Sequence, residues 1–237
     1  CTECGRCTDN CPAWATDKAL SPRDIVVKLR HFVTENANSD AMKEEYLPSD
    51  EWVTADELYA CTTCSACVEQ CPLFIDQMGK ILEMRRFLTM EGKLTGTAVR
   101  TLQKLGSHGN PWGFEATDRA PWAKENEVPV LGNGAGDNAE DFDVIFWTGC
   151  FGAFDPRGQE VATTITDLMK EAGVKFAIMG PNETCSGDPA RRLGEEALFQ
   201  ELAMTNVETM KGFNVKKVIA NCPHCFNTLK NEYPDFG

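Results

Sequence analysis

The sequence contains no long hydrophobic segment. Nowhere do about 18 or more apolar residues run together, which is the length that a membrane-spanning helix needs, so we expect none of the 237 residues to cross a bilayer. The first residues also lack the basic, apolar and small-residue regions of a secretory signal peptide. A transmembrane protein and a leader sequence are therefore both unexpected within these residues.

Positive charge is scarce. The 23 lysines and arginines face 36 aspartates and glutamates, which gives a net charge of −13 at pH 7. The phosphate backbone of a nucleic acid would be repelled by such a surface, and so would an anionic membrane leaflet. We therefore expect no nucleic-acid partner and no unaided docking on a membrane.

Motifs for common kinds of catalysis are missing as well. There are three histidines and no serine–histidine–aspartate pattern, and no flavin or nicotinamide fingerprint occurs. The glycine-rich stretch 132–136 lacks the lysine–serine or lysine–threonine ending of a phosphate-binding loop, so it is interpreted as a flexible joint.

Cysteine, in contrast, is abundant and regularly spaced. Eight of the twelve cysteines lie in two copies of the pattern CxxCxxCxxxCP. The copies are Cys1, Cys4, Cys7 and Cys11-Pro12, and then Cys61, Cys64, Cys67 and Cys71-Pro72. This is the ligand pattern of a two-cluster bacterial ferredoxin, in which the fourth cysteine of each run reaches the other cluster.

The pattern predicts two 4Fe-4S clusters with exchanged fourth ligands. Cys1, Cys4, Cys7 and Cys71 would hold cluster 1, and Cys61, Cys64, Cys67 and Cys11 would hold cluster 2. Zinc and disulfides are the alternatives. Zinc does not explain the third interval or the proline, and disulfides suit smaller secreted chains. Free thiols at this density indicate a reducing compartment.

Residues 1–94 are predicted to form the ferredoxin part. Ser21 and Pro22 are typical of a helix start, Thr54 begins a capping box before Cys61, and residues 75–90 are expected to be helical. Arg85 and Arg86 are interpreted as a solvated face, with contact to an acidic partner as the alternative. This part resembles the α-helical ferredoxin of the iron–sulfur subunits of fumarate and succinate oxidoreductases.

Residues 95–142 are predicted to be a connector. Periodicity is poor after about residue 105, which favours loop or linker, and Trp112 and Trp122 are expected to pin it to one domain. The chain also begins at Cys1, a predicted ligand, and we therefore expect it to be an excerpt of a longer protein.

Residues 143–237 have the pattern of an α/β domain. Three short apolar runs at 143–147, 174–179 and 217–220 alternate with helical segments at 158–172, at 190–211 and after Cys225. Strands that alternate with helices predict a parallel sheet with crossover helices.

The four remaining cysteines are expected to meet at one edge of that sheet. Cys150 and Cys222 follow predicted strands, Cys185 lies in a loop after another, and Cys225 completes a Cys-x-x-Cys pair. The carboxyl ends of parallel strands share one edge, where open α/β sheets bind ligands. Four converging thiols indicate a metal or cluster site, and four inert buried cysteines are the alternative.

The spacing of these cysteines resembles the CCG cysteine-rich domain. After Cys150, 34 residues lead to Cys185-Ser186-Gly187, and another 34 lead to Cys222 and Cys225. The resemblance implies a noncubane 4Fe-4S cluster held by five thiolates, but Ser186 replaces the second cysteine of the triplet. The third site is therefore left open between an iron–sulfur cluster and zinc.

The whole chain is similar to membrane-associated iron–sulfur oxidoreductases that link electron-transfer flavoprotein to menaquinone. The segments CTECGRCTDNCPA, CTTCSACVEQCP and NCPHCFNTLKNEYP carry this resemblance. It implies electron transfer from electron-transfer flavoprotein or another flavin dehydrogenase towards quinone. It also implies a haem and quinone membrane domain in the same polypeptide, with this soluble segment at the cytoplasmic face of the inner membrane.

Two other families share the order of ferredoxin followed by CCG domain. One is the heterodisulfide reductases, through their iron–sulfur D subunit, which implies disulfide reduction, and the incomplete triplet weakens it. The other comprises the iron–sulfur subunits of glycolate oxidase and anaerobic glycerol-3-phosphate dehydrogenase.

A non-catalytic docking domain with structural zinc is a further alternative. His224 is expected to pack or to face solvent, with a hydrogen bond to the third site or a proton relay as the alternative. Arg191-Arg192 either offset the charge of that site or begin a surface helix.

Overall fold

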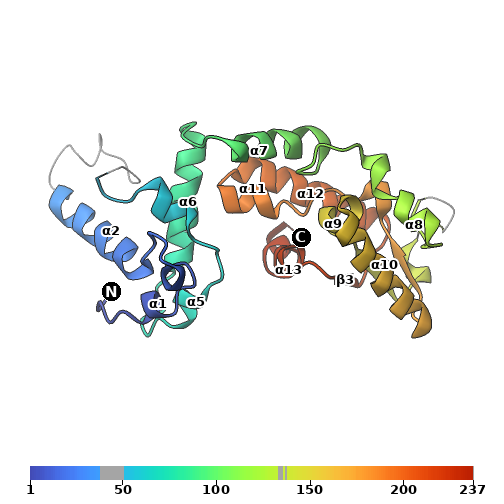
Figure 1. Cartoon of the computed structure of the whole chain (residues 1–237), viewed down its shortest axis with the longest axis horizontal. Helices are drawn as coiled ribbons and strands as arrows, with labels where there is room; N and C mark the ends of the chain where they lie inside the picture. Colours follow the sequence, from blue (N-terminus) through green and yellow to red (C-terminus); the bar gives the residue numbers. More distant parts are fainter. Residues whose placement is uncertain (38–50, 133–135, 137, 237) are drawn as a thin grey trace. The chain divides into compact units, whose positions relative to one another are not determined.

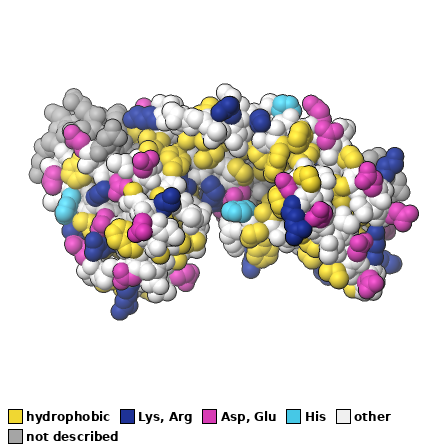
Figure 2. Space-filling view, viewed as in Figure 1, with side chains coloured by type: hydrophobic (Ala, Val, Ile, Leu, Met, Phe, Trp, Pro, Cys, Tyr) yellow, Lys and Arg dark blue, Asp and Glu magenta, His cyan; other side chains and the backbone are white. Residues whose placement is uncertain are grey.

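The computed structural model of the chain describes residues 1–37, 51–132, 136 and 138–236. The chain divides into two compact units: Cys1–Thr95 with Arg192–Glu195 form unit 1, and Gly96–Arg191 with Glu196–Gly237 form unit 2. Carboxylates are spread over the visible face, with lysines and arginines interspersed, as the net charge of −13 leads one to expect (Figure 2). The joint expected at 132–136 lies largely outside the described residues.

Unit 1 is helical (Figure 1). Its elements are α1 (Arg6–Asp9), η1 (Trp14–Thr16), α2 (Pro22–Asn36), α4 (Ala55–Tyr59), α5 (Ala66–Glu69) and α6 (Gln77–Met90). The expected helix starts are confirmed. The Ser21 side chain accepts a hydrogen bond from the Asp24 amide, and Thr54 forms a reciprocal capping box with Glu57. The α-helical ferredoxin fold predicted for this part is thus what the structure shows.

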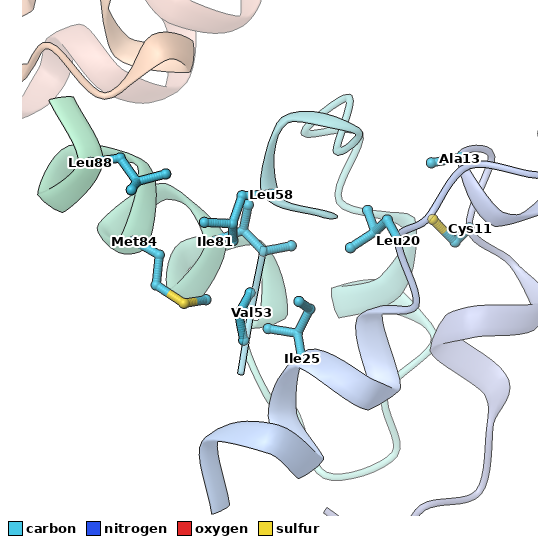
Figure 3. Close-up of a cluster of buried hydrophobic side chains, with 9 residues drawn as sticks. All are labelled: Cys11, Ala13, Leu20, Ile25, Val53, Leu58, Ile81, Met84 and Leu88. Atoms are coloured by element: carbon cyan, nitrogen blue, oxygen red, sulfur yellow. The ribbon is translucent and has the colours of Figure 1, made fainter. Parts of the chain in front are cut away.

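The core of unit 1 is small. Ile25 of α2, Leu58 of α4 and Ile81 of α6 have no exposed surface and point toward one another (Figure 3). The cluster of buried side chains comprises Cys11, Ala13, Leu20, Ile25, Val53, Leu58, Ile81, Met84 and Leu88. A cysteine of the first motif therefore lies within the hydrophobic core, so the core and the metal-binding loops are parts of one packed structure.

Arg85 does not lie on a solvated face, and this expectation was wrong. Its side chain is 3% exposed, and its guanidinium donates to the carbonyl oxygens of Leu58 and Cys61. These carbonyls lie at and just beyond the end of the short helix α4, where the regular helical hydrogen bonds stop, and the Leu58 oxygen also accepts the Cys61 amide. Arg85 therefore ties the second cysteine motif to α6. Helical periodicity could not reveal this, because the contacts span 24 and 27 residues.

Replacing Arg85 with methionine should destabilise unit 1. The change keeps most of the aliphatic stem but removes a donor to the Cys61 carbonyl and one of the donors to the Leu58 carbonyl, and an unsatisfied buried group costs about 1–3 kcal/mol. We expect a lower urea midpoint for loss of cluster absorbance under anaerobic conditions. Lys80→Met on the same helix is the control, since Lys80 is exposed and its replacement should leave the free energy of unfolding within about 0.5 kcal/mol of the parent. Equal midpoints for the two variants would contradict this role.

Unit 2 contains the parallel sheet. Strand β1 (Val144–Trp147) lies between β2 (Phe176–Ile178) and β3 (Val218–Ala220), and both pairings are parallel. In the register, Ile145 lies opposite Ala177 on one side and Val218 on the other. The three strands and the α/β class were predicted correctly, with each strand one to three residues shorter than its apolar run.

Helices connect and extend this sheet. They are α7 (Thr97–His108), η2 (Ala116–Arg119), α8 (Pro121–Glu125), η3 (Ala139–Asp141), α9 (Gly149–Phe154), α10 (Pro156–Glu171), η4 (Gly180–Asn182), α11 (Asp188–Leu193), α12 (Glu196–Gly212), α13 (Pro223–Asn227), the π-helical turn η5 (Thr228–Glu232) and η6 (Tyr233–Phe236). The single helix expected at 190–211 is two helices, because Gly194 takes a left-handed conformation with φ of 91° between them.

The stretch after residue 105, expected to be loop, carries structure of its own. α7 continues to His108, and η2 and α8 follow. Trp122 of α8 is buried in a core with Phe146 of β1 and Ile178 of β2, so it anchors this stretch as expected. Among the described residues, no helix has both the length and the apolar character that crossing a bilayer requires.

Candidate metal centres

The two cysteine motifs of unit 1 adopt the same backbone conformation. In the first copy the third and fifth residues, Glu3 and Gly5, have φ values of 57° and 84°. In the second copy the equivalent residues, Thr63 and Ser65, have φ values of 54° and 64°. Left-handed conformations are costly for residues other than glycine, so three such residues at matching positions indicate a loop shape that the rest of the structure enforces.

This loop shape directs amide groups toward sulfur. The Glu3 amide lies 3.4 Å from Cys1 Sγ, and the Thr63 amide lies 3.3 Å from Cys61 Sγ. The Ile75 amide lies 3.4 Å from Cys71 Sγ. Hydrogen bonds to sulfur stabilise the negative charge of a thiolate and raise the reduction potential of any iron–sulfur cluster it binds. The motifs thus supply both thiols and polarising donors.

One cavity brings together cysteines of both motifs. Its sulfur-bearing residues are Cys1, Cys4 and Cys7 of the first copy and Cys71 of the second. Arg23, Ile75 and Gln77 complete part of its wall. The short helices α1 and α5, each of which carries the third cysteine of its motif, contact each other and hold the two copies together.

A second cavity contains the complementary set. It is lined by Cys61, Cys64 and Cys67 of the second copy and by Cys11 of the first, with Met78 and Ile81 of α6 beside them. Each cavity therefore gathers three cysteines from one motif and the fourth from the other. All eight cysteines carry free thiols, so no disulfide joins any of these residues.

Burial makes three of these thiols poor acids on their own. Desolvation raises the pKa of Cys67 to about 12, and burial also raises the pKa of Cys7 and of Cys61. A bound cation reverses this, because a coordinating thiol is deprotonated outright. Clustered, partly buried thiols with amide donors aimed at sulfur fit an iron–sulfur cluster as a ligand set.

The four cysteines of unit 2 form two adjacent pairs. Cys150 lies in α9 directly after β1, and it is close enough to Cys185, which follows η4, for each thiol to shift the pKa of the other. Cys222 is the N-cap residue of α13, and it and Cys225 inside that helix likewise shift each other's pKa. The pairs are also near each other, since Cys225 is close enough to raise the pKa of Cys185 through its charge.

A glycine allows the two pairs to approach. Gly149 has φ of 69°, and a Cβ atom on it would lie 3.3 Å from Cys225 Sγ. Any larger residue there would strain the backbone and press on that sulfur. The expected convergence of Cys150, Cys185, Cys222 and Cys225 is therefore what the structure shows. Within the described part of the chain, no three cysteine, histidine or carboxylate groups are drawn together as tightly as ligands of one ion. The thiolates of a cluster bind different iron atoms and stand farther apart.

Ser186 faces this site. Its hydroxyl lies 3.6 Å from Cys225 Sγ, and the side chain is almost fully buried. Its carbonyl oxygen accepts a hydrogen bond of 3.0 Å from the Tyr233 hydroxyl. The residue that replaces the second cysteine of the triplet therefore presents an oxygen where the complete motif would present sulfur.

Two charged residues that the sequence did not single out also reach the third site. Arg119 of η2 donates to Cys150 Sγ at 3.2 Å and to Glu183 Oε1 at 3.0 Å. Glu183 also accepts the amides of Thr148 and Gly149, at 3.1 and 2.9 Å. Burial raises the pKa of Glu183 to about 7, although Arg119 and the two amides act in the opposite direction. No motif marks either residue.

Two of the residues that the sequence did single out, Arg191 and His224, have side chains that pair with carboxylates. Arg191 pairs with Glu196 and Glu232. The His224 ring is mostly exposed, and its Nδ1 lies 3.2 Å from Asp188 Oδ2. The counter-charge that touches a thiol of the third site is therefore Arg119.

Together, the ferredoxin fold of unit 1 and the parallel sheet of unit 2 define a class of protein: an iron–sulfur protein with a dicluster domain and a second, cysteine-rich domain. Residues 1–75 match the family model for a 4Fe-4S dicluster domain, and residues 144–230 match that for a CCG cysteine-rich domain.

Curated relatives resemble the chain from end to end. It is 36% identical to the probable iron-sulfur-binding oxidoreductase FadF of Bacillus subtilis, over 100% of this chain and 39% of the relative. It is also 36% identical to the EtfAB:quinone oxidoreductase of Syntrophomonas wolfei, over 100% of this chain and 37% of the relative. A heterodisulfide reductase component from Methanosarcina barkeri is 27% identical over 99% of this chain and 57% of the relative. No solved structure matches the chain.

The chain therefore carries both domains and is similar, over its whole length, to iron–sulfur oxidoreductases. It spans about two fifths of the length of the first two relatives.

Proposed function

We propose that this chain is the segment of a longer oxidoreductase that conducts single electrons from a reduced flavin towards a membrane quinone. The observation that carries the proposal is the pair of cavities in unit 1, each lined by three cysteines of one motif and the fourth of the other. Cys1, Cys4, Cys7 and Cys71 would bind one 4Fe-4S cluster, and Cys61, Cys64, Cys67 and Cys11 the other.

The protein's own groups set how readily such clusters accept electrons. The amides of Glu3, Thr63 and Ile75 donate toward sulfur, and Arg85 holds the carbonyl of Cys61 in place. When bound, a cluster takes up and releases one electron at a time. The cysteines serve as ligands and not as nucleophiles.

For the third site we propose an iron–sulfur cluster held by Cys150, Cys185, Cys222 and Cys225. Four converging thiols and a buried guanidinium at Cys150 support a negatively charged group there. Zinc has the same thiolate preference and is the alternative. Zinc is redox-inactive, so with zinc bound unit 2 would have only a structural or docking role.

The relatives suggest the donor and the acceptor. One is named for electron-transfer flavoprotein and quinone, and another, from Chromohalobacter salexigens, is named a probable membrane-anchored ferredoxin. We propose the same donor here, with a haem and quinone membrane domain in the same polypeptide and with this segment at the cytoplasmic face. Two electrons leave the flavin hydroquinone singly, and the quinone takes up two electrons and two protons.

Disulfide reduction is the second candidate, because one relative is a heterodisulfide reductase component. It is less favoured. That relative is 27% identical, against 36% for the quinone-linked one, and Ser186 leaves the cysteine triplet incomplete.

Electron transfer from the flavoprotein can be tested directly. The full-length protein, purified anaerobically, would be mixed with photoreduced electron-transfer flavoprotein, and cluster reduction would be followed by bleaching of visible absorbance and by EPR. We expect the clusters to become reduced, and a quinone analogue to reoxidise them. Clusters that dithionite reduces but the reduced flavoprotein does not would contradict the proposed donor. Faster turnover with a disulfide than with the quinone would favour the second candidate.

A further inference from the structure

A buried ion pair adjoins the third cysteine site. The Arg119 and Glu183 side chains are 3% and 1% exposed, and their Nη1 and Oε1 atoms lie 3.0 Å apart. The second guanidinium nitrogen of Arg119 lies 3.2 Å from Cys150 Sγ. Taking two charges out of water costs several kcal/mol each, so a pair buried this completely, and in contact with a thiol, calls for a physical reason.

The environment holds the Arg119 guanidinium in one place. Its central carbon lies 5.0 Å from the centre of the Phe154 ring, a cation–π distance, and its Nη2 lies 3.5 Å from the carbonyl oxygen of Gly109. Glu183 is fixed by the Thr148 and Gly149 amides as well as by Arg119. A carboxylate that accepts three N–H groups and donates none has the geometry of the ionised form. Arginine stays protonated in proteins, so its positive charge is fixed, whereas burial opposes the negative charge of Glu183 by raising its pKa to about 7.

The two charges stand at unequal distances from Cys150. Arg119 contacts its sulfur, whereas Glu183 contacts Arg119 and the backbone that leads into α9. Because electrostatic interactions fall with distance and are strong where water is excluded, the positive charge acts more strongly on Cys150 than the negative one does.

The positive charge comes from outside the domain that carries the cysteines. Arg119 lies in η2, whereas the match to the cysteine-rich family covers residues 144–230. The stretch that joins the cysteine motifs of the two units in sequence therefore contributes a side chain to the third site.

We propose that Arg119 is a positioning residue that raises the reduction potential of the third site, and that Glu183 holds it there and limits the effect. This inference deepens the proposed function, since it rests on a redox-active cluster at Cys150, Cys185, Cys222 and Cys225. A fixed positive charge beside a ligand thiolate favours the form of the site that carries one more electron. The negative charge of Glu183 favours the oxidised form.

The test is a pair of substitutions with opposite expected signs. Arg119→Gln removes the positive charge and should lower the ratio of reduced to oxidised third site at least tenfold at the potential where the parent is half reduced. Glu183→Gln should raise the same ratio at least tenfold. For a one-electron couple, a tenfold change corresponds to about 59 mV. The readout is an EPR redox titration of the full-length protein, and the two ferredoxin clusters serve as internal references that should not move.

Two controls separate charge from structure. Arg157→Gln removes an arginine of the same unit whose side chain is 77% exposed, and it should not shift the third site. Arg119→Lys keeps the positive charge and should titrate close to the parent even if Arg119→Gln loses the site. Shifts of both Gln variants in the same direction, or no shift in either, would overturn the inference.

The metal content and EPR signals of the parent protein test the proposed function independently of the two Gln variants. A parent protein with zinc and no third EPR signal would refute the redox cluster at this site. The effect of the Arg119 charge on the thiolates would then be tested by the rate of zinc release to a chelator. Release should be faster in Arg119→Gln and slower in Glu183→Gln than in the parent. Equal release rates would overturn it.

Discussion

Cys4→Ala combined with Cys71→Ala should cost the protein one cluster, whereas Cys4→Ala combined with Cys11→Ala should cost it two. Cys4 and Cys71 line the same cavity, so the second substitution removes a ligand from a cluster that is already lost. Cys11 lines the other cavity with Cys61, Cys64 and Cys67, so its loss adds to that of Cys4. The losses should be about four and about eight irons per chain in unit 1.

The same pair of variants distinguishes the exchanged arrangement from a sequential one. If each motif bound its own cluster, Cys4→Ala with Cys11→Ala would lose one cluster, and Cys4→Ala with Cys71→Ala would lose two. Iron and acid-labile sulfide per chain, measured on anaerobically purified protein, give the answer. Each double variant is the control for the other, because both remove two of the eight thiols and share Cys4→Ala.

Removal of the clusters should unfold unit 1 and leave most of unit 2 folded. Among the described residues, unit 1 has a single small core, and Cys11 is part of it. Structural metal sites contribute on the order of 10 kcal/mol to folding, which is comparable to the whole stability of a domain. Unit 2 has cores that do not depend on cysteine, such as the one formed by Trp122, Phe146 and Ile178.

Hydrogen exchange before and after anaerobic removal of iron with a chelator tests this dependence. Amides of α2 and α6 should lose their protection, and those of β1 and α10 should keep it. Arg85→Met, which weakens unit 1 without touching a thiol, should make the loss occur at a lower chelator concentration. Protection in α2 and α6 that survives complete removal of iron would contradict the account.

Local signals in the sequence predicted much of the fold. Ser21 and Thr54 were recognised as helix caps because the residues that complete each cap lie within one turn. The strands around Ile145 and Ala177 were recognised because buried parallel strands are short apolar runs between helices. The cysteine spacing alone was enough to group the thiols that the cavities bring together.

The rest depends on contacts between distant residues. Arg119 and Cys150 are 31 positions apart, and Arg119 and Glu183 are 64 apart. Nothing in the sequence distinguishes Arg119, which is buried, from Arg157, which is exposed. Arg85 was misplaced for the same reason, since its partners at Leu58 and Cys61 become visible only when α4 and α6 are packed together.

The central claim is that the two cysteine motifs bind inorganic clusters that carry single electrons. Iron, zinc and acid-labile sulfide per anaerobically purified chain, with EPR of the reduced form, test it most directly. We predict about eight irons and eight sulfides from unit 1, with the signals of two 4Fe-4S clusters, and a further contribution from the third site. A colourless protein with zinc in place of iron, or with its thiols joined as disulfides, would contradict the account.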